Sequence, residues 1–206
     1  FGTANNYTVP DGYPYWEALH YTWGDQMRAA RVEEMLDSGR HMTVADMMRF
    51  QHDELTVAGR NIVSLLREIK LDVPEVARLR DLLFDWDYVL DKDSIEAAIY
   101  VTFERHLRTN VRELVIPAEA RAVIGGISTK RLIDWLVAPD GRFGEAPVAG
   151  RDAVLAKSRT DTLSELNDKL GPDMSTWQYG QRDFKHALIR HPMTAAVNAD
   201  LRRRLD

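Results

Sequence analysis

The sequence predicts a mainly α-helical fold. From residue 23 onward, apolar residues recur nearly everywhere at three- and four-residue spacing, which places them on one face of a helix. Ser, Thr and Asp precede several of these stretches, and Gly or Pro follows them, as expected for helix starts and stops. Only Phe1 to Tyr7, a short run before Pro10, is typical of a strand.

Two helices are predicted in the first third of the chain. Gln26 to Leu36 carries a mixed three- and four-residue apolar spacing and ends at the stop signal Asp37-Ser38-Gly39. Thr43, with Asp46 three residues later, is typical of a capping arrangement. The apolar face continues beyond this cap, so we expect one long helix from Thr43 to about Ile69.

Further helices are predicted in the rest of the chain. Pro74 suits a first helical turn, because a proline loses nothing where no N–H bond is made. Asp93 or Ser94 caps the following helix. The expected ranges are Pro74 to Trp86, Ser94 to near Ile116, Ser128 to Val137, Asp152 to Leu170 and Thr194 to Leu205. Trp86 and Trp177 are predicted to pack in the core.

Composition excludes several functional classes. The 206 residues carry 27 Lys and Arg against 32 Asp and Glu, so the net charge of -5 does not favour a nucleic-acid partner. No apolar run is long enough to span a bilayer, and we expect no membrane contact. The chain has no Cys, which excludes disulfides and thiolate metal sites. Arg202-Arg203-Arg204 ends a predicted helix, where cations complement the helix dipole.

The single predicted strand indicates that this chain docks onto more protein. Phe1 to Tyr7 has no convincing partner strand within the chain. An unpaired strand edge is an aggregation hazard, so we expect another segment to supply the sheet.

The N-terminal segment also carries groups suited to oxyanion chemistry. Asn5 is a side-chain amide donor, and Asp25 and Arg28 follow within a short span. An amide donor can stabilise the negative charge that develops when an amide carbonyl is attacked. The chain has no matching nucleophile, since it lacks Cys and Phe1 has no hydroxyl or thiol. We therefore interpret the chain as one part of an enzyme.

Several stretches in collinear order resemble the penicillin acylase family of N-terminal-nucleophile hydrolases. The resemblance runs from about Phe1 to Asn198 and corresponds to the later part of the family's β subunit. It rests on Ala4-Asn5-Asn6, Tyr13-Pro14, Trp23-Gly24 with Arg28, Gln51-His52-Asp53, Trp86-Asp87 with Asp93-Ser94, Trp177-Gln178-Tyr179-Gly180 and His191-Pro192.

The resemblance implies a fold, a chemistry and partners. The chain would be the helical portion of an αββα hydrolase, with residues 1–16 as strand and loop of the catalytic sheet and residues 23–206 as a single helical region. A serine supplied by another segment would attack the amide of an N-acylated substrate, such as a β-lactam or an acyl-homoserine lactone. The remaining α- and β-subunit segments would be its partners, and the protein would be periplasmic or secreted, with any export signal upstream of Phe1.

The resemblance also assigns roles to individual residues. Asn5 would donate to the oxyanion, and Arg28 would help to hold that asparagine. Glu17 falls where several members have an acidic ligand to a structural calcium ion, commonly Asp. No cofactor is implied for the chemistry itself. One carboxylate cannot define a calcium site, because calcium takes six to eight oxygens.

Each assignment has a structural alternative. Asn5 and Asn6 can form a turn, Arg28 can pair with Asp25 or Glu33, and Glu17 can be a surface carboxylate. His52-Asp53-Glu54 and the pair His186 and His191 lack the spacing of metal ligands, and Ser94 is a helix cap. A helical scaffold or interaction module without a catalytic role is the alternative function.

Overall fold

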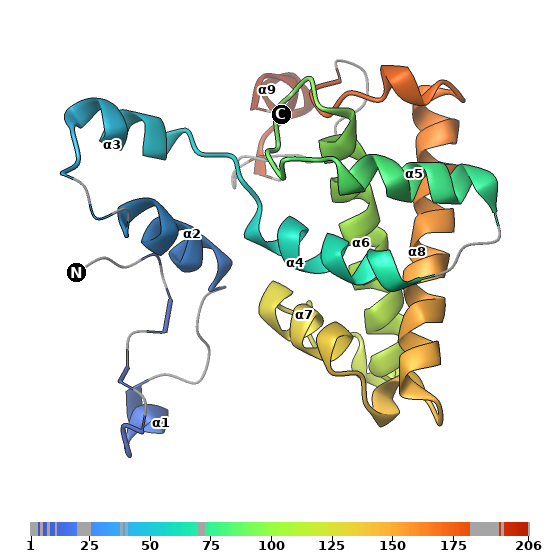
Figure 1. Ribbon diagram of the computed structural model, residues 1–206, viewed down its shortest axis with the longest axis horizontal. Helices are drawn as coiled ribbons and strands as arrows, with labels where there is room; N and C mark the ends of the chain where they lie inside the picture. The colour runs from blue at the N-terminus through green and yellow to red at the C-terminus, as the bar shows by residue number, and fades with distance from the viewer. Residues whose placement is uncertain are drawn as a thin grey trace.

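The protein is mainly α-helical, as the sequence predicts. The computed structural model describes residues 4, 6–7, 9–10, 12–19, 26–37, 39, 41–69, 73–181, 194 and 196–205. Its α-helices are α1 (Trp16–Leu19), α2 (Met27–Leu36), α3 (Val44–Gln51), α4 (Val57–Leu65), α5 (Pro74–Phe84), α6 (Ile95–Val115), α7 (Thr129–Val137), α8 (Pro147–Leu170) and α9 (Ala199–Leu205) (Figure 1). Short 3-10 turns are η1 (Leu66–Glu68), η2 (Ala118–Ala120), η3 (Gly141–Phe143) and η4 (Met174–Thr176).

Two long helices, α6 and α8, lie side by side at the centre of the fold. Helix α5 crosses both of them, and α4 packs on α7. We call α4 to α8 the helical body. Helices α1, α2 and α3 form a separate N-terminal arm that lies beside the body in Figure 1, with α2 against α4.

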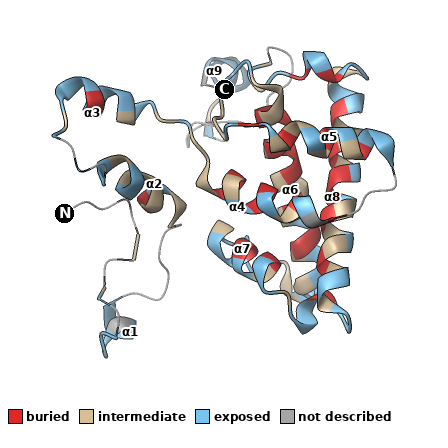
Figure 2. Ribbon diagram, viewed as in Figure 1, coloured by how far each residue is buried: buried red, intermediate tan, exposed pale blue. Residues whose placement is uncertain are grey.

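The helical body is held by a continuous apolar core, and most of the buried positions, red in Figure 2, lie in this body. Each fully buried Leu, Ile or Phe side chain contributes roughly 1.5–3 kcal/mol relative to an exposed one. Those with no exposed surface include Ile62, Leu79, Leu83, Ile99, Phe103, Leu107, Leu132, Leu136, Leu155 and Leu166. They come from α4 to α8, so every helix of the body contributes to one core.

Side-chain caps begin the predicted helices where expected. The Ser94 hydroxyl accepts a hydrogen bond from the Ala97 N–H at 3.0 Å, so Ser94 rather than Asp93 caps α6. Ser128 caps α7 in the same way, and Pro74 occupies the first turn of α5. These caps satisfy backbone N–H groups that have no partner within the helix.

Both predicted core tryptophans are buried. The indole N–H of Trp86 donates to the Val89 carbonyl oxygen at 3.0 Å, and that of Trp177 donates to the Gly171 carbonyl oxygen at 2.8 Å. A buried indole therefore supplies apolar packing without an unsatisfied donor.

The prediction of one long helix from Thr43 to Ile69 is wrong. The structure has two helices, α3 and α4, separated by residues 52–56. In this connection the Thr56 N–H donates to the Tyr88 carbonyl oxygen at 2.9 Å, and the Leu90 N–H donates to the Glu54 carbonyl oxygen at 3.0 Å. Backbone groups that would extend the helix instead pair with residues 88–90, and Thr56 caps α4.

Two helices begin at different residues from those predicted. Helix α8 starts at Pro147 rather than Asp152, because Pro147 takes the first turn, where it needs no N–H partner. Helix α9 starts at Ala199 rather than Thr194, and the Asn198 side-chain oxygen accepts a bond from the Leu201 N–H at 3.0 Å. The apolar pattern alone did not reveal either boundary.

Some sequence predictions lie outside the described residues. These include most of the strand predicted for Phe1 to Tyr7 and the pair His186 and His191. Within the described part of the chain, the isolated bridge between Leu55 and Val89 is the only β pairing. No helix there has the length and hydropathy that a bilayer crossing requires.

Arg159 on α8 is an unusual member of the core. Its side chain is fully buried, and neither terminal guanidinium nitrogen has a hydrogen-bond partner among the described residues. Burial, followed by the nearby charge of Arg80, lowers the pKa of Arg159 to about 10. Its Nε donates to the Leu155 carbonyl oxygen at 3.3 Å, but burial of those two terminal nitrogens carries a desolvation cost that opposes the stability supplied by the surrounding apolar residues.

We predict that Gly150→Ala destabilises the helical body. A Cβ at this position of α8 would lie 1.9 Å from the Phe143 carbonyl oxygen, so η3 would have to move. We expect a loss of about 1–3 kcal/mol in the free energy of unfolding, measured by urea denaturation. Helix propensity alone would raise the free energy of unfolding by up to about 1 kcal/mol. A decrease would therefore identify the clash with the Phe143 carbonyl oxygen as the cause.

Gly141→Ala is the matched control, because a Cβ there has no atom within 4 Å. Equal stability of the two variants would contradict the close approach of η3 to α8.

Candidate functional site

Two side chains at the start of α2 hold the segment that contains Asn5. The Arg28 guanidinium Nη2 donates to the Ala4 carbonyl oxygen at 3.1 Å, and the Tyr7 N–H donates to Gln26 Oε1 at 3.1 Å. The Ala4 carbonyl belongs to the planar peptide unit that joins residues 4 and 5. Arg28 thus restrains the backbone directly before Asn5, which itself lies outside the described residues.

The Asn6 side chain bonds to the local backbone, in agreement with its structural alternative as a turn residue. Its Oδ1 accepts a hydrogen bond from the Ala4 N–H at 2.9 Å, and its Nδ2 donates to the Tyr7 carbonyl oxygen at 3.3 Å. Asn side chains commonly stabilise turns by such bonds to their own main chain. Its amide is therefore engaged with the local backbone on both sides of residue 5.

A hollow lies between this segment and α2. It has a volume of about 470 Å³ and is lined on one side by Ala4 and Asn6 and on the other by residues of α2 and its C-terminal end. Those lining residues are Ala29, Val32, Glu33, Leu36 and Asp37. The hollow places open space beside the backbone that flanks Asn5.

Ion pairs attach helix α2 to α4 and to the connection that precedes it. Arg31 donates to both carboxylate oxygens of Asp53, from Nε at 2.8 Å and from Nη2 at 2.6 Å. Arg31 also contacts Glu34 at 3.1 Å, and Glu34 pairs with Arg60 of α4. The hydrogen bonds from Arg31 hold the pKa of Asp53 below its ordinary value despite partial burial, and those from Arg60 do the same for Glu34.

A larger cleft separates α2 from the body on the face that carries Arg28 and Arg31. Its volume is about 590 Å³, and its walls include Met27 and Met35 of α2 and Leu55. Glu104 of α6 and Thr129 of α7 also line it. Arg28 is thus an exposed cation at the boundary between the arm and the body.

The Glu17 carboxylate is solvent-exposed on the short helix α1. Among the residues that the structure describes, no group of three or more His, Asp or Glu side chains could hold a metal ion. Glu17 therefore belongs to no such group within the described ranges.

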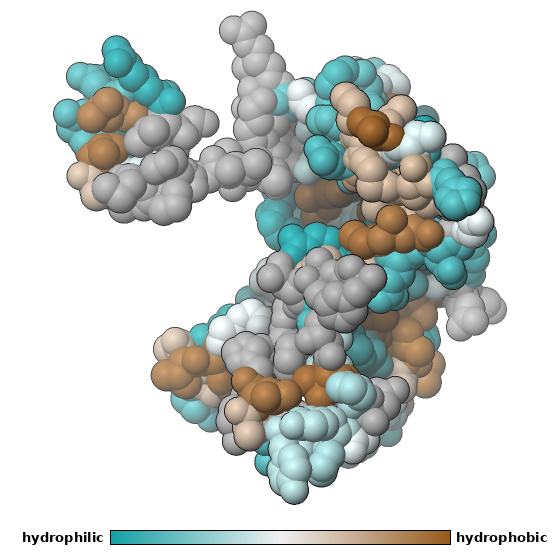
Figure 3. Space-filling view, turned by 90° about the vertical axis from the view of Figure 1, so that its left-hand side faces the viewer, coloured by the Kyte–Doolittle hydropathy of each residue, from teal (hydrophilic) through white to brown (hydrophobic). Residues whose placement is uncertain are grey.

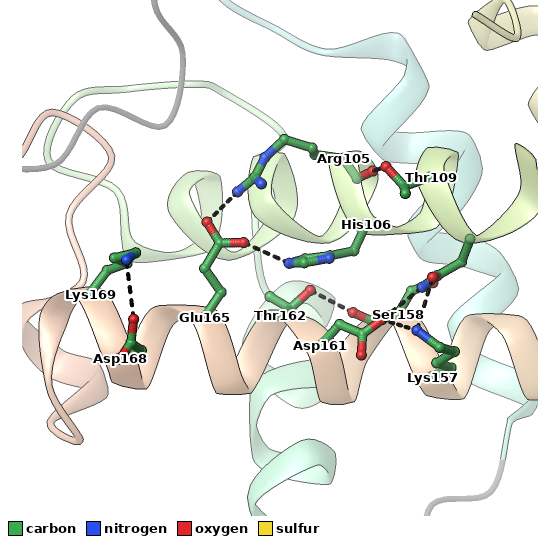
Figure 4. A network of polar contacts seen from close by, with 11 residues as sticks. Arg105, His106, Thr109, Lys157, Ser158, Asp161, Thr162, Glu165, Asp168 and Lys169 are labelled. Atoms are coloured by element: carbon green, nitrogen blue, oxygen red, sulfur yellow. Dashed lines mark hydrogen bonds and ion pairs between the residues drawn. The ribbon is translucent and has the colours of Figure 1, made fainter. Parts of the chain in front are cut away.

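A separate polar network connects α6 and α8 (Figure 4). Glu165 contacts Arg105 at 2.6 Å and the His106 Nε2 at 2.7 Å. On the same side of α8, Asp161 accepts hydrogen bonds from Lys157 at 2.5 Å and from Asn110 at 2.8 Å. Each carboxylate is matched by a cation, so the network is an interhelical clamp rather than a set of reactive groups.

Two other candidates also have structural roles. Asp53 of the His52-Asp53-Glu54 run is paired with Arg31, and Ser94 caps α6. Both observations agree with the structural readings of these residues.

The comparison with known protein families agrees with the resemblance found in the motifs. The sequence pattern of the penicillin amidase family matches residues 1–204, nearly the whole chain. The chain belongs to the penicillin amidase family.

Two curated proteins are distant relatives of this penicillin amidase chain. The acyl-homoserine lactone acylase QuiP of Pseudomonas fluorescens (strain Pf0-1) is 25% identical over 228 residues, which cover 94% of this chain and 27% of that protein. QuiP of Pseudomonas aeruginosa is 24% identical over 209 residues, which cover 87% of this chain and 24% of that protein. The chain thus spans about a quarter of the length of these relatives.

The sequence did not identify all the residues that position the site. The sequence predicts Gln26 only as the start of a helix, yet its side-chain oxygen accepts a hydrogen bond from the Tyr7 N–H. The contact between Arg31 and Asp53 joins residues 22 positions apart, and no local pattern predicts it. The short-range signals of capping and periodicity carry no information on such pairs.

We predict that the penicillin amidase chain loses stability in acid through the α6–α8 network. Burial alone would raise the pKa of both Glu165 and Asp161. Arg105 and His106 outweigh burial at Glu165 and hold its pKa below the ordinary value of 4.5. Lys157 and Asn110 do the same at Asp161, whose ordinary pKa is 3.8. Lowered carboxyl pKa values stabilise the fold above the ordinary values, and this stability is lost as pH falls through the folded-state values.

We expect the free energy of unfolding, measured by urea denaturation, to fall as pH drops below about 5 and through the lowered pKa values of these two carboxyl groups. Glu165→Gln should reduce that dependence, because the variant has no carboxylate to protonate at this position. A variant with the wild-type pH profile would contradict the assignment.

Proposed function

We propose that the whole protein is an amidohydrolase that cleaves the bond between an acyl chain and an amine-bearing head group. The observation that carries this proposal is the family match over residues 1–204. The two relatives are named as acyl-homoserine lactone acylases, which makes such lactones one candidate substrate class. Acylated β-lactams are another candidate within the family.

The proposed reaction uses a serine that another segment presents at its own N-terminus. The serine hydroxyl attacks the amide carbonyl while the α-amine of the same residue takes its proton. The resulting oxyanion receives a hydrogen bond from the Asn5 side-chain amide. The amine then leaves with a proton, and water hydrolyses the acyl-enzyme to release the carboxylic acid and restore the serine.

Arg28 would support Asn5 in this scheme. Its bond to the Ala4 carbonyl oxygen and the bond between Tyr7 and Gln26 restrain the backbone on both sides of residue 5. An oxyanion donor contributes most when it is already oriented before the charge develops. The exposed position of Arg28 on the cleft is compatible with a site that other segments complete.

The remaining segments of the same precursor are the proposed partners, and α3 offers a surface for them. All eight residues of α3 are described, and only Asp46 is buried, whereas Val44 and Met48 are 79% and 62% exposed. Figure 3, which faces the arm, shows brown hydrophobic patches on this side of the molecule. An isolated helix of this length is marginal in water, so α3 is expected to gain stability from protein packed over it.

A structural calcium ion and a location outside the cytoplasm are two further proposals, and both rest on the family resemblance. Glu17 would supply one carboxylate to a structural calcium ion, with the other oxygens coming from residues outside the described part, and the chemistry would need no cofactor. Metal analysis of the assembled wild-type and Glu17→Gln proteins tests this role. We infer a periplasmic or secreted protein, which cell fractionation can check.

We predict that Asn5→Ala in the assembled protein lowers kcat for acyl-amide hydrolysis by about 10²–10³-fold while folding stays intact. The reason is the loss of one hydrogen-bond donor to the developing oxyanion. Release of the free amine from acyl-homoserine lactones and from an acylated β-lactam measures the rate. Wild-type turnover by the variant would refute the role of Asn5, and absence of hydrolysis by the wild-type protein would refute the proposed function.

We also predict that Met48→Asp weakens the association of this chain with the other subunit segments. A charge at an apolar contact must lose its hydration when the partner packs over it. Co-purification of the processed segments measures the effect, and Met48→Leu, which keeps the apolar surface, is the control. Equal recovery of partner from the Asp and Leu variants would argue against α3 as the contact.

A further inference from the structure

Helix α2 has limited apolar attachment to the rest of the protein, through buried Ala29 and half-buried Met27, which packs against the core. All ten of its residues are described, and only Ala29 is buried. Burial of one small side chain removes little apolar surface from water, so this helix gains far less from the hydrophobic effect than those of the body. Its position against α4 therefore depends on polar contacts as well as on this limited apolar packing.

The pair between Arg31 and Asp53 is the most directional of those polar contacts. Two parallel bonds of 2.8 and 2.6 Å join the guanidinium fork to both carboxylate oxygens. The side chains are 25% and 20% exposed, whereas those of Arg60 and Glu34 are 36% and 39% exposed. A bidentate Arg–carboxylate pair fixes orientation as well as distance, and partial burial reduces its screening by water and salt.

Asp53 lies in the connection that the backbone of residues 88–90 anchors to the helical body. Arg31 lies one turn beyond Arg28 on α2, and both side chains line the same cleft. The contacts thus form one chain of attachment, from the body through Asp53 and Arg31 to α2. From α2 it continues through Arg28 to the Ala4 carbonyl oxygen, and through Gln26 to the Tyr7 N–H.

We propose that Arg31 and Asp53 are positioning residues that set the placement of α2, and through it the backbone on both sides of Asn5. This inference rests on the proposed acylase function for its effect on catalysis. A misplacement of about 1 Å in a catalytic constellation can lower the rate by about 10²-fold even when substrate binding changes little. The pair therefore acts on turnover through geometry and touches neither substrate nor nucleophile.

The test uses the assembled, processed protein with Asp53→Asn and Arg31→Lys. Asp53→Asn keeps the shape of the side chain but loses its charge, and Arg31→Lys keeps the charge but loses the fork. The matched control is Glu165→Gln, which breaks another ion pair between elements, at 2.6 Å from Arg105, far along the chain from the arm. We expect kcat to fall about 10–100-fold in both test variants with KM changed by less than about threefold, and the control to keep wild-type values of both.

Hydrogen exchange provides a readout that does not depend on activity. The Tyr7 N–H is bonded to Gln26 Oε1, so exchange of the peptide covering residues 4–7 should be faster in Asp53→Asn than in the wild-type protein, and unchanged in Glu165→Gln. The double variant Arg31→Asp with Asp53→Arg restores opposite charges and should recover part of the protection and of kcat.

The outcomes separate the two proposals. A wild-type protein that hydrolyses no acyl amide would overturn the proposed function, while the exchange comparison would still decide the role of the pair. An active protein whose test variants keep wild-type kcat and exchange would overturn the positioning role alone. Equal losses in Asp53→Asn and Glu165→Gln would also overturn it, because they would indicate general destabilisation.

Discussion

The packing of α6 against α8 is the interaction on which the rest of the fold depends. These two helices are the longest in the described chain, and each contributes fully buried side chains, such as Phe103 and Leu155, to the core. Helix α5 and η3 pack on the pair, and α4 with α7 completes the core. Apolar burial is not directional, so this body tolerates an anomaly such as Arg159, whose two terminal guanidinium nitrogens have no hydrogen-bond partner among the described residues.

The candidate site lies at the N-terminal arm, where the helices bury the least apolar surface. Helices α2 and α3 bury one residue each, and the segment around Asn5 is attached to α2 by hydrogen bonds from Arg28 and to Gln26. Polar contacts define geometry well but contribute little net free energy. A site built in this way is well suited to being completed by further protein, and the chain spans only about a quarter of the relatives it matches.

Local sequence signals were sufficient to predict the start of a helix where residues within a few positions of that start determine it. Ser94, Ser128 and Pro74 mark helix starts that the structure confirms, because capping involves residues no more than a few positions apart. The same signals failed between α3 and α4. Apolar periodicity continues through both helices, and the pairing of residues 54–56 with residues 88–90 interrupts the helix.

The sequence by itself determined the helical class, most of the helix positions and, through collinear motifs, the penicillin amidase family. These properties depend on short-range spacing or on residue identity. Tertiary structure alone decided that Arg31 meets Asp53, that Gln26 binds the Tyr7 backbone and that α3 exposes its apolar face. Such contacts arise when segments distant in the chain are brought together by the packing of the body, and no local pattern encodes them.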